Sequence, residues 1–192
     1  MIGLIAYVAL AGKPIYVPYR TIPGGLVRAG SQVWEIQYRR AEYVDSEGLP
    51  IDETVNTMRV LRNRTKVFEL HKGGALVVIR ANTPAPFPVF IVKSHSWNGH
   101  GELTFVFGIR NGRFFKMLDA GYGEIGGPIY RDFDRDGTME WVFDDYDWYT
   151  HERQGPENYV VYKLSGDGIL RHWKTFENKK REGLPRDSRF VF

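Results

Sequence analysis

Tight-turn signals between short apolar runs are the feature that most constrains the fold of this chain. The clearest is Asn111-Gly112, which separates two apolar runs within residues 102–118. This dipeptide tolerates the positive φ angles of a two-residue hairpin turn, so it predicts two antiparallel strands. The same design recurs in two other segments, residues 158–176 around Gly166-Asp167-Gly168 and residues 66–80 around Lys72-Gly73-Gly74.

Strand periodicity dominates the remaining sequence. Trp34, Ile36 and Tyr38 alternate with polar residues within residues 33–44, as in a strand with one buried face. Residues 87–94 form a continuous apolar run, which is typical of a strand covered on both faces. Helical periodicity is confined to residues 52–63, where we expect a short helix. The sequence therefore predicts an all-β fold.

Two parts of the chain are related by an internal repeat. Each part reads as a strand, a long loop, a strand, a tight turn and a strand, and a unit of about 50 residues of this kind is blade-like. We therefore expect antiparallel blade-like repeats in a partial or small β-propeller. Phe90, Val92 and Trp97 match Trp141, Phe143 and Trp148 at a spacing of 51 residues, and Glu102, Phe105, Phe107 and Ile109 match Glu157, Val160, Tyr162 and Leu164 at a spacing of 55.

A proline-rich connector, residues 82–88, is the best candidate for a boundary in this 192-residue chain. It predicts a β-rich N-terminal region, residues 1–83, and a blade-like repeat region, residues 84–192, which can also form one continuous domain. The apolar residues 1–12 are expected to be a buried first strand, with a leader remnant as the alternative. They are too short for a membrane-spanning helix of about 20 residues, so no integral membrane span is expected.

Charge is distributed unevenly along the chain. Residues 119–153 contain ten acidic residues and three arginines, although the net charge of the whole chain is +3. A basic protein with one concentrated acidic window favours a local cation site over nucleic-acid binding. The sequence contains no cysteine, which excludes disulfides, zinc thiolate sites and cysteine nucleophiles.

The acidic window contains a loop with alternating aspartates. Asp132, Asp134 and Asp136 stand at positions one, three and five of this loop, and Gly137 at position six permits a sharp turn. Ca²⁺ prefers six to eight oxygen ligands, which alternating side chains of a curled loop can supply. An EF-hand would place a bidentate glutamate at position twelve, where this chain has Phe143. The flanking residues also read as strands, so the loop is not an EF-hand.

The loop resembles the calcium loop of FG-GAP and VCBS-type repeats, which form blades of integrin-like β-propellers. The resemblance is close over residues 121–145 and looser over residues 84–176. It implies that Ca²⁺ binds to the side chains of Asp132, Asp134, Asp136 and Glu140 and to the carbonyl oxygen of Thr138. The last acid in the integrin version is usually aspartate, so Glu140 is a departure that either binds through water or faces away.

The resemblance also implies a function. We expect a calcium-stabilised, non-catalytic binding or scaffolding domain of the cell envelope or exterior, located outside the cell or in the periplasm. Its expected partner is a protein or a glycan, and no nucleic-acid partner is expected. A closed propeller needs four or more blades, so the alternatives are an incomplete propeller and a homo-oligomer that completes the blades.

An enzymatic alternative rests on the same acidic residues, although the sequence favours a non-catalytic role. Residues 133–139 also resemble the first motif of haloacid-dehalogenase-type phosphatases, in which Asp134 would be the nucleophile and Asp136 the general acid beside Mg²⁺. That family requires a parallel αβ sheet with crossover helices, which the hairpin patterns do not indicate. A glycan hydrolase that uses the acidic edge is the second enzymatic alternative. A further, non-enzymatic interpretation of the loop is a solvated acidic turn without metal.

Aromatic and histidine residues of two matching loops form a second candidate site. If the repeat holds, they converge at one edge of the sheets, where they can form a platform for a sugar or a peptide. The alternative is that these aromatic residues cover the edges of the blades. The residues are Trp97, His100, Trp148, Tyr149 and His151.

Overall fold

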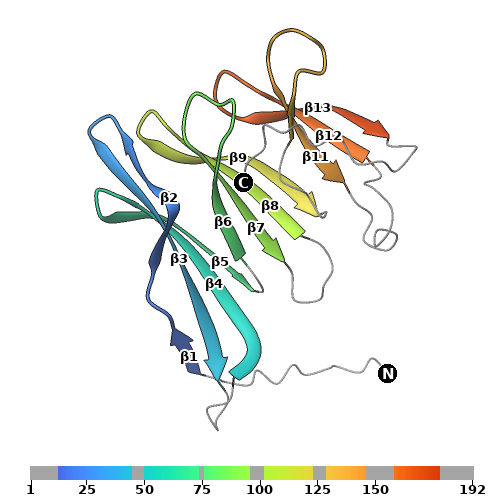
Figure 1. Ribbon diagram of the computed structural model, residues 1–192. Coiled ribbons are helices and arrows are strands. Elements are labelled where there is room, and N and C mark those ends of the chain that lie inside the picture. Colours follow the sequence, from blue (N-terminus) through green and yellow to red (C-terminus); the bar gives the residue numbers. More distant parts are fainter. Residues whose placement is uncertain are drawn as a thin grey trace, which may run out of the picture.

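The protein is an all-β structure. The computed structural model describes residues 13–44, 50–73, 76–95, 102–122, 129–145 and 158–177, which form thirteen strands and no helix. The strands belong to three antiparallel sheets that stand side by side in an open fan (Figure 1). The prediction of an all-β fold with antiparallel, blade-like sheets is therefore confirmed.

The first sheet is a four-stranded meander with one additional strand. The meander runs β2-β3-β4-β5, and β1 pairs with the far end of β3. The bounds are β1 (Lys13–Tyr16), β2 (Arg20–Ala29), β3 (Gln32–Val44), β4 (Pro50–Arg62) and β5 (Thr65–Gly73).

The short helix expected at residues 52–63 is wrong, because this segment belongs to strand β4. β4 is hydrogen-bonded to β3 on one side and to β5 on the other, and these pairings satisfy its backbone. Met58 and Val60 are fully buried on the core face, while Arg59 between them lies on the opposite face. This period of two overrides the weak helical pattern of the sequence.

The second and third sheets are four-stranded meanders with the same strand order. The second comprises β6 (Leu76–Ala81), β7 (Val89–His95), β8 (Glu102–Arg110) and β9 (Arg113–Tyr122). The third comprises β10 (Ile129–Arg131), β11 (Glu140–Asp145), β12 (Asn158–Leu164) and β13 (Leu170–Glu177). The proline-rich connector, residues 82–88, thus joins two strands of the second sheet, and the chain passes from the first sheet to the second between β5 and β6.

The register of the strands reproduces the spacing of the sequence repeat. Among the described residues, those that match at a spacing of 51 lie on β7 and β11, and Phe105, Phe107 and Ile109 on β8 match residues of β12 at a spacing of 55. Matching residues also form matching cross-strand pairs, so the repeat is a repeat of structure. Phe90 pairs with Phe107 as Trp141 pairs with Tyr162, and Val92 pairs with Phe105 as Phe143 pairs with Val160.

Two apolar layers hold the three sheets together. The first layer lies between the first and second sheets and includes Trp34 and Ile36 facing Phe90 and Phe107. The second lies between the second and third sheets and contains Val89, Val106, Met117, Leu118, Trp141, Phe143 and Leu170. Large aromatic side chains supply much of the buried apolar area in these layers, which is the main stabilising contribution of such packing.

A polar network lies on the outer face of the first sheet. Arg59 Nε donates a hydrogen bond to Gln37 Oε1 at 2.6 Å, and Gln37 Nε2 donates to Glu35 Oε1 at 2.7 Å. The Arg59 guanidinium also lies over the Tyr19 ring, 3.5 Å from its centroid. A polar network of this kind suits contact with water and resembles the capping faces at the ends of repeat stacks.

Candidate metal centre

The candidate metal centre is the loop that joins β10 to β11 in the third sheet. Arg131 and Glu140 form the last pair of this hairpin, so residues 132–139 must reverse the chain. Arg135 and Gly137 both adopt left-handed backbone conformations, with φ angles of 62° and 84°. Glycine is the residue that adopts this conformation at least cost, which explains the sharp turn after Asp136.

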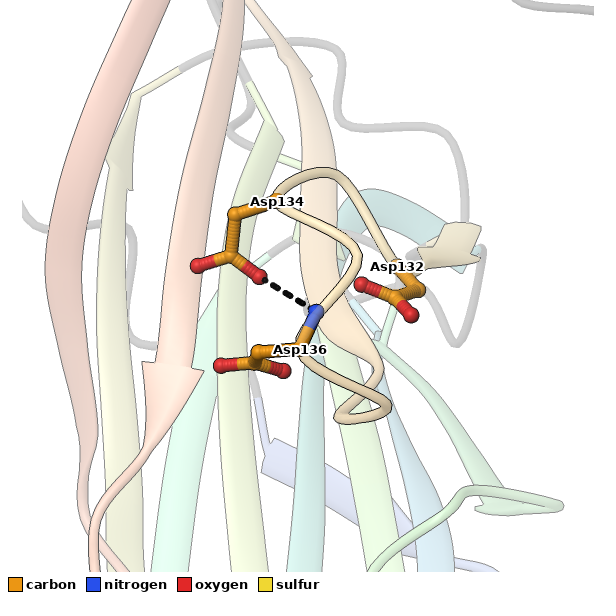
Figure 2. Close-up of side chains that lie close together, drawn as sticks. All are labelled: Asp132, Asp134 and Asp136. Carbon is orange, nitrogen blue, oxygen red and sulfur yellow. Dashed lines mark hydrogen bonds between the residues drawn. The ribbon is translucent and has the colours of Figure 1, made fainter.

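Each aspartate of the loop uses one carboxylate oxygen to fix the loop backbone. Asp132 Oδ2 accepts a hydrogen bond from the Gly137 N–H at 3.0 Å, and Asp136 Oδ1 accepts one from the Thr138 N–H at 2.7 Å. Asp134 Oδ1 accepts one from the Asp136 N–H at 3.3 Å, the contact drawn in Figure 2. The second oxygen of each carboxylate is the one that a cation can bind, and in Asp134 and Asp136 a lysine side chain already contacts it.

The three carboxylates are close enough to share one cation. Asp132, Asp134 and Asp136 each offer an oxygen, and these oxygens all lie within 4.8 Å of one another. Two oxygens bound to the same Ca²⁺ at 2.3–2.6 Å are separated by at most about 5 Å, so the spacing is compatible with this ion. Asp134 and Asp136 are exposed and Asp132 is half-buried, which leaves room for water ligands.

Two buried carboxylate oxygens at the loop support the interpretation as a cation site. Asp132 Oδ1 and Glu140 Oε1 are shielded from solvent and accept no hydrogen bond among the described residues, although the Lys163 ammonium lies 3.4 Å from Glu140 Oε1. An unsatisfied buried polar group costs about 1–3 kcal/mol and more when it is charged. A bound cation would satisfy such oxygens, whereas a simple acidic surface turn has no reason to bury them.

Glu140 lies beneath the loop. Its side chain is fully buried, and its Oε2 accepts a hydrogen bond from the Phe133 N–H at 2.7 Å. Phe133 in turn stacks on the Phe176 ring, with centroids 5.5 Å apart, and packs against a buried apolar cluster on the outer face of the third sheet. Glu140 and Phe133 together anchor the acidic loop to the sheet.

A lysine contacts the same carboxylates. Lys163 Nζ donates hydrogen bonds to Asp134 Oδ2 and, at 3.1 Å, to Asp136 Oδ2, and it lies 3.4 Å from Glu140 Oε1. These bonds, chiefly the one to Asp134, raise the pKa of the Lys163 ammonium above its usual range. The pKa of Asp136 is lowered by the Thr138 N–H first and by Lys163 second. Lys163 therefore provides an internal positive charge for the acidic loop.

Sequence reasoning found the aspartates but missed Lys163. Lys163 lies on β12, and its contact with Asp136 joins residues 27 positions apart. The repeat placed β12 beside β11, but no local motif indicates which side chain of β12 reaches over the loop. Of the other predicted ligands, Thr138 is exposed at the end of the loop and Glu140 turns inward beneath it. The predicted platform lies outside the described residues, which end at residues 95 and 145 before its two loops: Trp97, His100, Trp148, Tyr149 and His151.

Comparison with protein-family models, with curated proteins and with solved structures finds no match to this chain. The likeness of the loop to FG-GAP and VCBS-type repeats therefore stays a prediction from the sequence. Within the described ranges there is no apolar helix long enough to cross a membrane.

Proposed function

We propose that this protein is a calcium-stabilised, blade-type β domain with a non-catalytic binding or scaffolding role. The observation that carries the proposal is the convergence of Asp132, Asp134 and Asp136 oxygens within 4.8 Å at a loop that also buries an unpartnered oxygen of Asp132. The ion neutralises the loop between β10 and β11 and thereby stabilises the third sheet. Ca²⁺ is favoured because every candidate ligand is an oxygen and the loop offers no imidazole or thiolate.

The proposed location is the cell envelope or the cell exterior. The candidate ligands are partly exposed, and Lys163 already neutralises part of their charge, so the affinity for Ca²⁺ is expected to be modest. Extracellular calcium modules bind with dissociation constants of about 10⁻⁴–10⁻³ M, which suit the calcium concentration outside the cytosol. A site of this strength is filled there and stays empty in a cytosol with little free calcium.

The partner is proposed to be a protein or a glycan. The aromatic and histidine residues of the predicted platform stand in the sequence between β7 and β8 and between β11 and β12, which are corresponding strand pairs of neighbouring sheets. Loops at the same end of adjacent sheets commonly form binding surfaces on a rigid scaffold. A homo-oligomer that completes the blades remains part of the proposal.

The phosphohydrolase alternative has less support. Phosphatases with this first motif place the nucleophilic aspartate after a strand of a parallel sheet, whereas Asp134 lies in a hairpin loop between antiparallel strands. Asp134 is also engaged by Lys163 and by the Asp136 N–H. The described residues contain no helix that would supply the crossovers of that fold.

Thermal unfolding in calcium and in chelator tests the proposal. A ligand at 100 times its Kd that binds only the folded state adds about 2.7 kcal/mol. For a domain of this size that corresponds to a rise of roughly 5–10 °C in Tm. Asp134→Ala should abolish this rise, whereas Asp167→Ala should preserve it, because Asp167 is an exposed carboxylate that pairs with Arg171 outside the loop. Equal Tm values for the wild type in calcium and in chelator would refute the proposed calcium role.

A further inference from the structure

Lys163 occupies the oxygens that a metal would need. Asp134 and Asp136 each spend Oδ1 on a backbone N–H of the loop, so Oδ2 is the oxygen left for a cation. Lys163 Nζ binds both of these Oδ2 atoms. An ammonium in this position and a divalent ion bound to the same oxygens would repel each other strongly at such short range.

The same ammonium also faces a buried oxygen. Glu140 Oε1 belongs to a side chain that is fully buried, has no hydrogen bond within the described part of the chain, and points to Nζ at 3.4 Å. The site is thus built around one cation position with buried and exposed carboxylates on several sides. Lys163 fills this position with a charge that is covalently attached to the protein.

We propose that Lys163 is a tethered cation that competes with the divalent metal for Asp134 and Asp136, and that metal binding displaces its ammonium from the loop. This inference rests on the proposed calcium function and adds a mode of regulation to it. The competition lowers the affinity for Ca²⁺ and keeps the loop neutralised when calcium is scarce. The protein therefore remains folded without metal and binds Ca²⁺ reversibly.

The Lys163 ammonium can move into solvent when it leaves the carboxylates. Lys163 is 30% exposed, so its side chain has access to solvent. Its Nζ also lies 4.7 Å from the centroid of the Trp173 ring on β13, which is 37% exposed. When Lys163 leaves the carboxylates, its position relative to this ring changes.

The first test is a calorimetric titration of CaCl₂ into the wild type, Lys163→Met, Lys163→Arg and Lys174→Met. Lys163→Met keeps most of the side-chain length without the charge and should bind Ca²⁺ at least tenfold more tightly. Lys163→Arg keeps the charge and should stay within about threefold of the wild type. Lys174→Met is the matched control, because Lys174 lies over the Phe176 ring at 4.8 Å and its removal changes the net charge equally. Its affinity should also stay within about threefold.

The outcomes separate this inference from the proposed function. If Lys163→Met alone binds Ca²⁺ more tightly than the wild type, the competition is supported. If Lys163→Met binds Ca²⁺ and the wild type does not, the competition is supported but calcium binding by the native protein is refuted. Equal affinity of Lys163→Met and the wild type would overturn the competition but leave the calcium site intact. Absence of binding in all four proteins would overturn both.

A second test uses the wild type alone, in case Lys163→Met does not fold. Amine-reactive labelling followed by mass spectrometry measures how accessible each lysine is. Calcium should increase labelling of Lys163 severalfold and leave labelling of Lys174 unchanged. If calcium binds and the labelling of Lys163 stays constant or decreases, the ammonium is not displaced and the inference is wrong.

Discussion

Replacing Glu140 by glutamine removes the negative charge beneath the loop and keeps the size and shape of the side chain. Glu140 is fully buried, accepts the Phe133 N–H at 2.7 Å and faces Lys163 Nζ at 3.4 Å. Hydrogen bonds to charged groups contribute about 1.5–3 kcal/mol, compared with 0.5–1.5 kcal/mol for neutral ones. Whichever way the amide is oriented, its NH₂ group also faces another donor, so one buried donor lacks an acceptor. Together these losses predict a destabilisation of about 2 kcal/mol for Glu140→Gln.

Chemical denaturation in chelator measures this change without any contribution from metal. A loss of about 2 kcal/mol should also lower Tm by roughly 4–8 °C for a domain of this size. Asp167→Asn serves as the control, because Asp167 is half-exposed, and its Tm should stay within about 2 °C of the wild type. If Glu140→Gln were as stable as the wild type, Glu140 would not anchor the loop, and the account of its burial would be wrong.

Three further changes test other parts of the fold. Trp141→Ala should cost about 3–5 kcal/mol in a denaturation experiment, because Trp141 is fully buried between the second and third sheets, and a cost below about 1 kcal/mol would contradict this packing. Arg64→Gly should raise the unfolding free energy by about 0.5–1 kcal/mol, because Arg64 has a φ of 68° that glycine adopts without strain. A lower stability of this variant would show that the contacts of the Arg64 side chain outweigh the relief of backbone strain. Glu69 accepts hydrogen bonds from Lys66 at 2.8 Å and from Tyr19 at 3.0 Å, and these contacts lower its pKa below 4.5. Its stabilisation is therefore present above pH 4.5 and lost as the pH falls through the lowered folded-state pKa. The Tm difference between the wild type and Glu69→Gln should shrink as the pH is lowered below 4.5, and a difference that stays constant would contradict the assigned contacts.

Local signals were sufficient to predict most of the fold. Asn111 and Gly112 adopt φ angles of 51° and 71°, as expected for a two-residue hairpin turn. Such turns fix which strands are neighbours, and the spacing of the repeat fixes the register of the second and third sheets. Both signals lie within short segments, which explains why the sequence alone reveals them.

The features that sequence reasoning missed depend on contacts between distant segments. Strand β4 is followed by a turn at Asn63 and Arg64, where Asn63 exchanges hydrogen bonds with the backbone of Val33 on β3. Arginine with a positive φ gives no turn signal in a sequence, so the turn was not visible and a helix was expected there.

The candidate site also combines features that follow from local sequence with features that depend on distant segments. The aspartates stand at alternate positions of one loop, and their convergence follows from local spacing alone. The contact of Lys163 with this loop depends on the register of β11 against β12, where a shift of one residue would turn its side chain to the other face. Burial of Glu140 likewise depends on how the loop folds over the sheet.

The most direct measurement is an anomalous difference map from crystals grown with millimolar calcium. We expect one strong peak at 2.3–2.6 Å from oxygens of Asp132, Asp134 and Asp136, with the Lys163 ammonium moved away from Asp134. A map without a peak at the loop, in which Lys163 still binds Asp134 and Asp136, would contradict the claim that this loop is a calcium site.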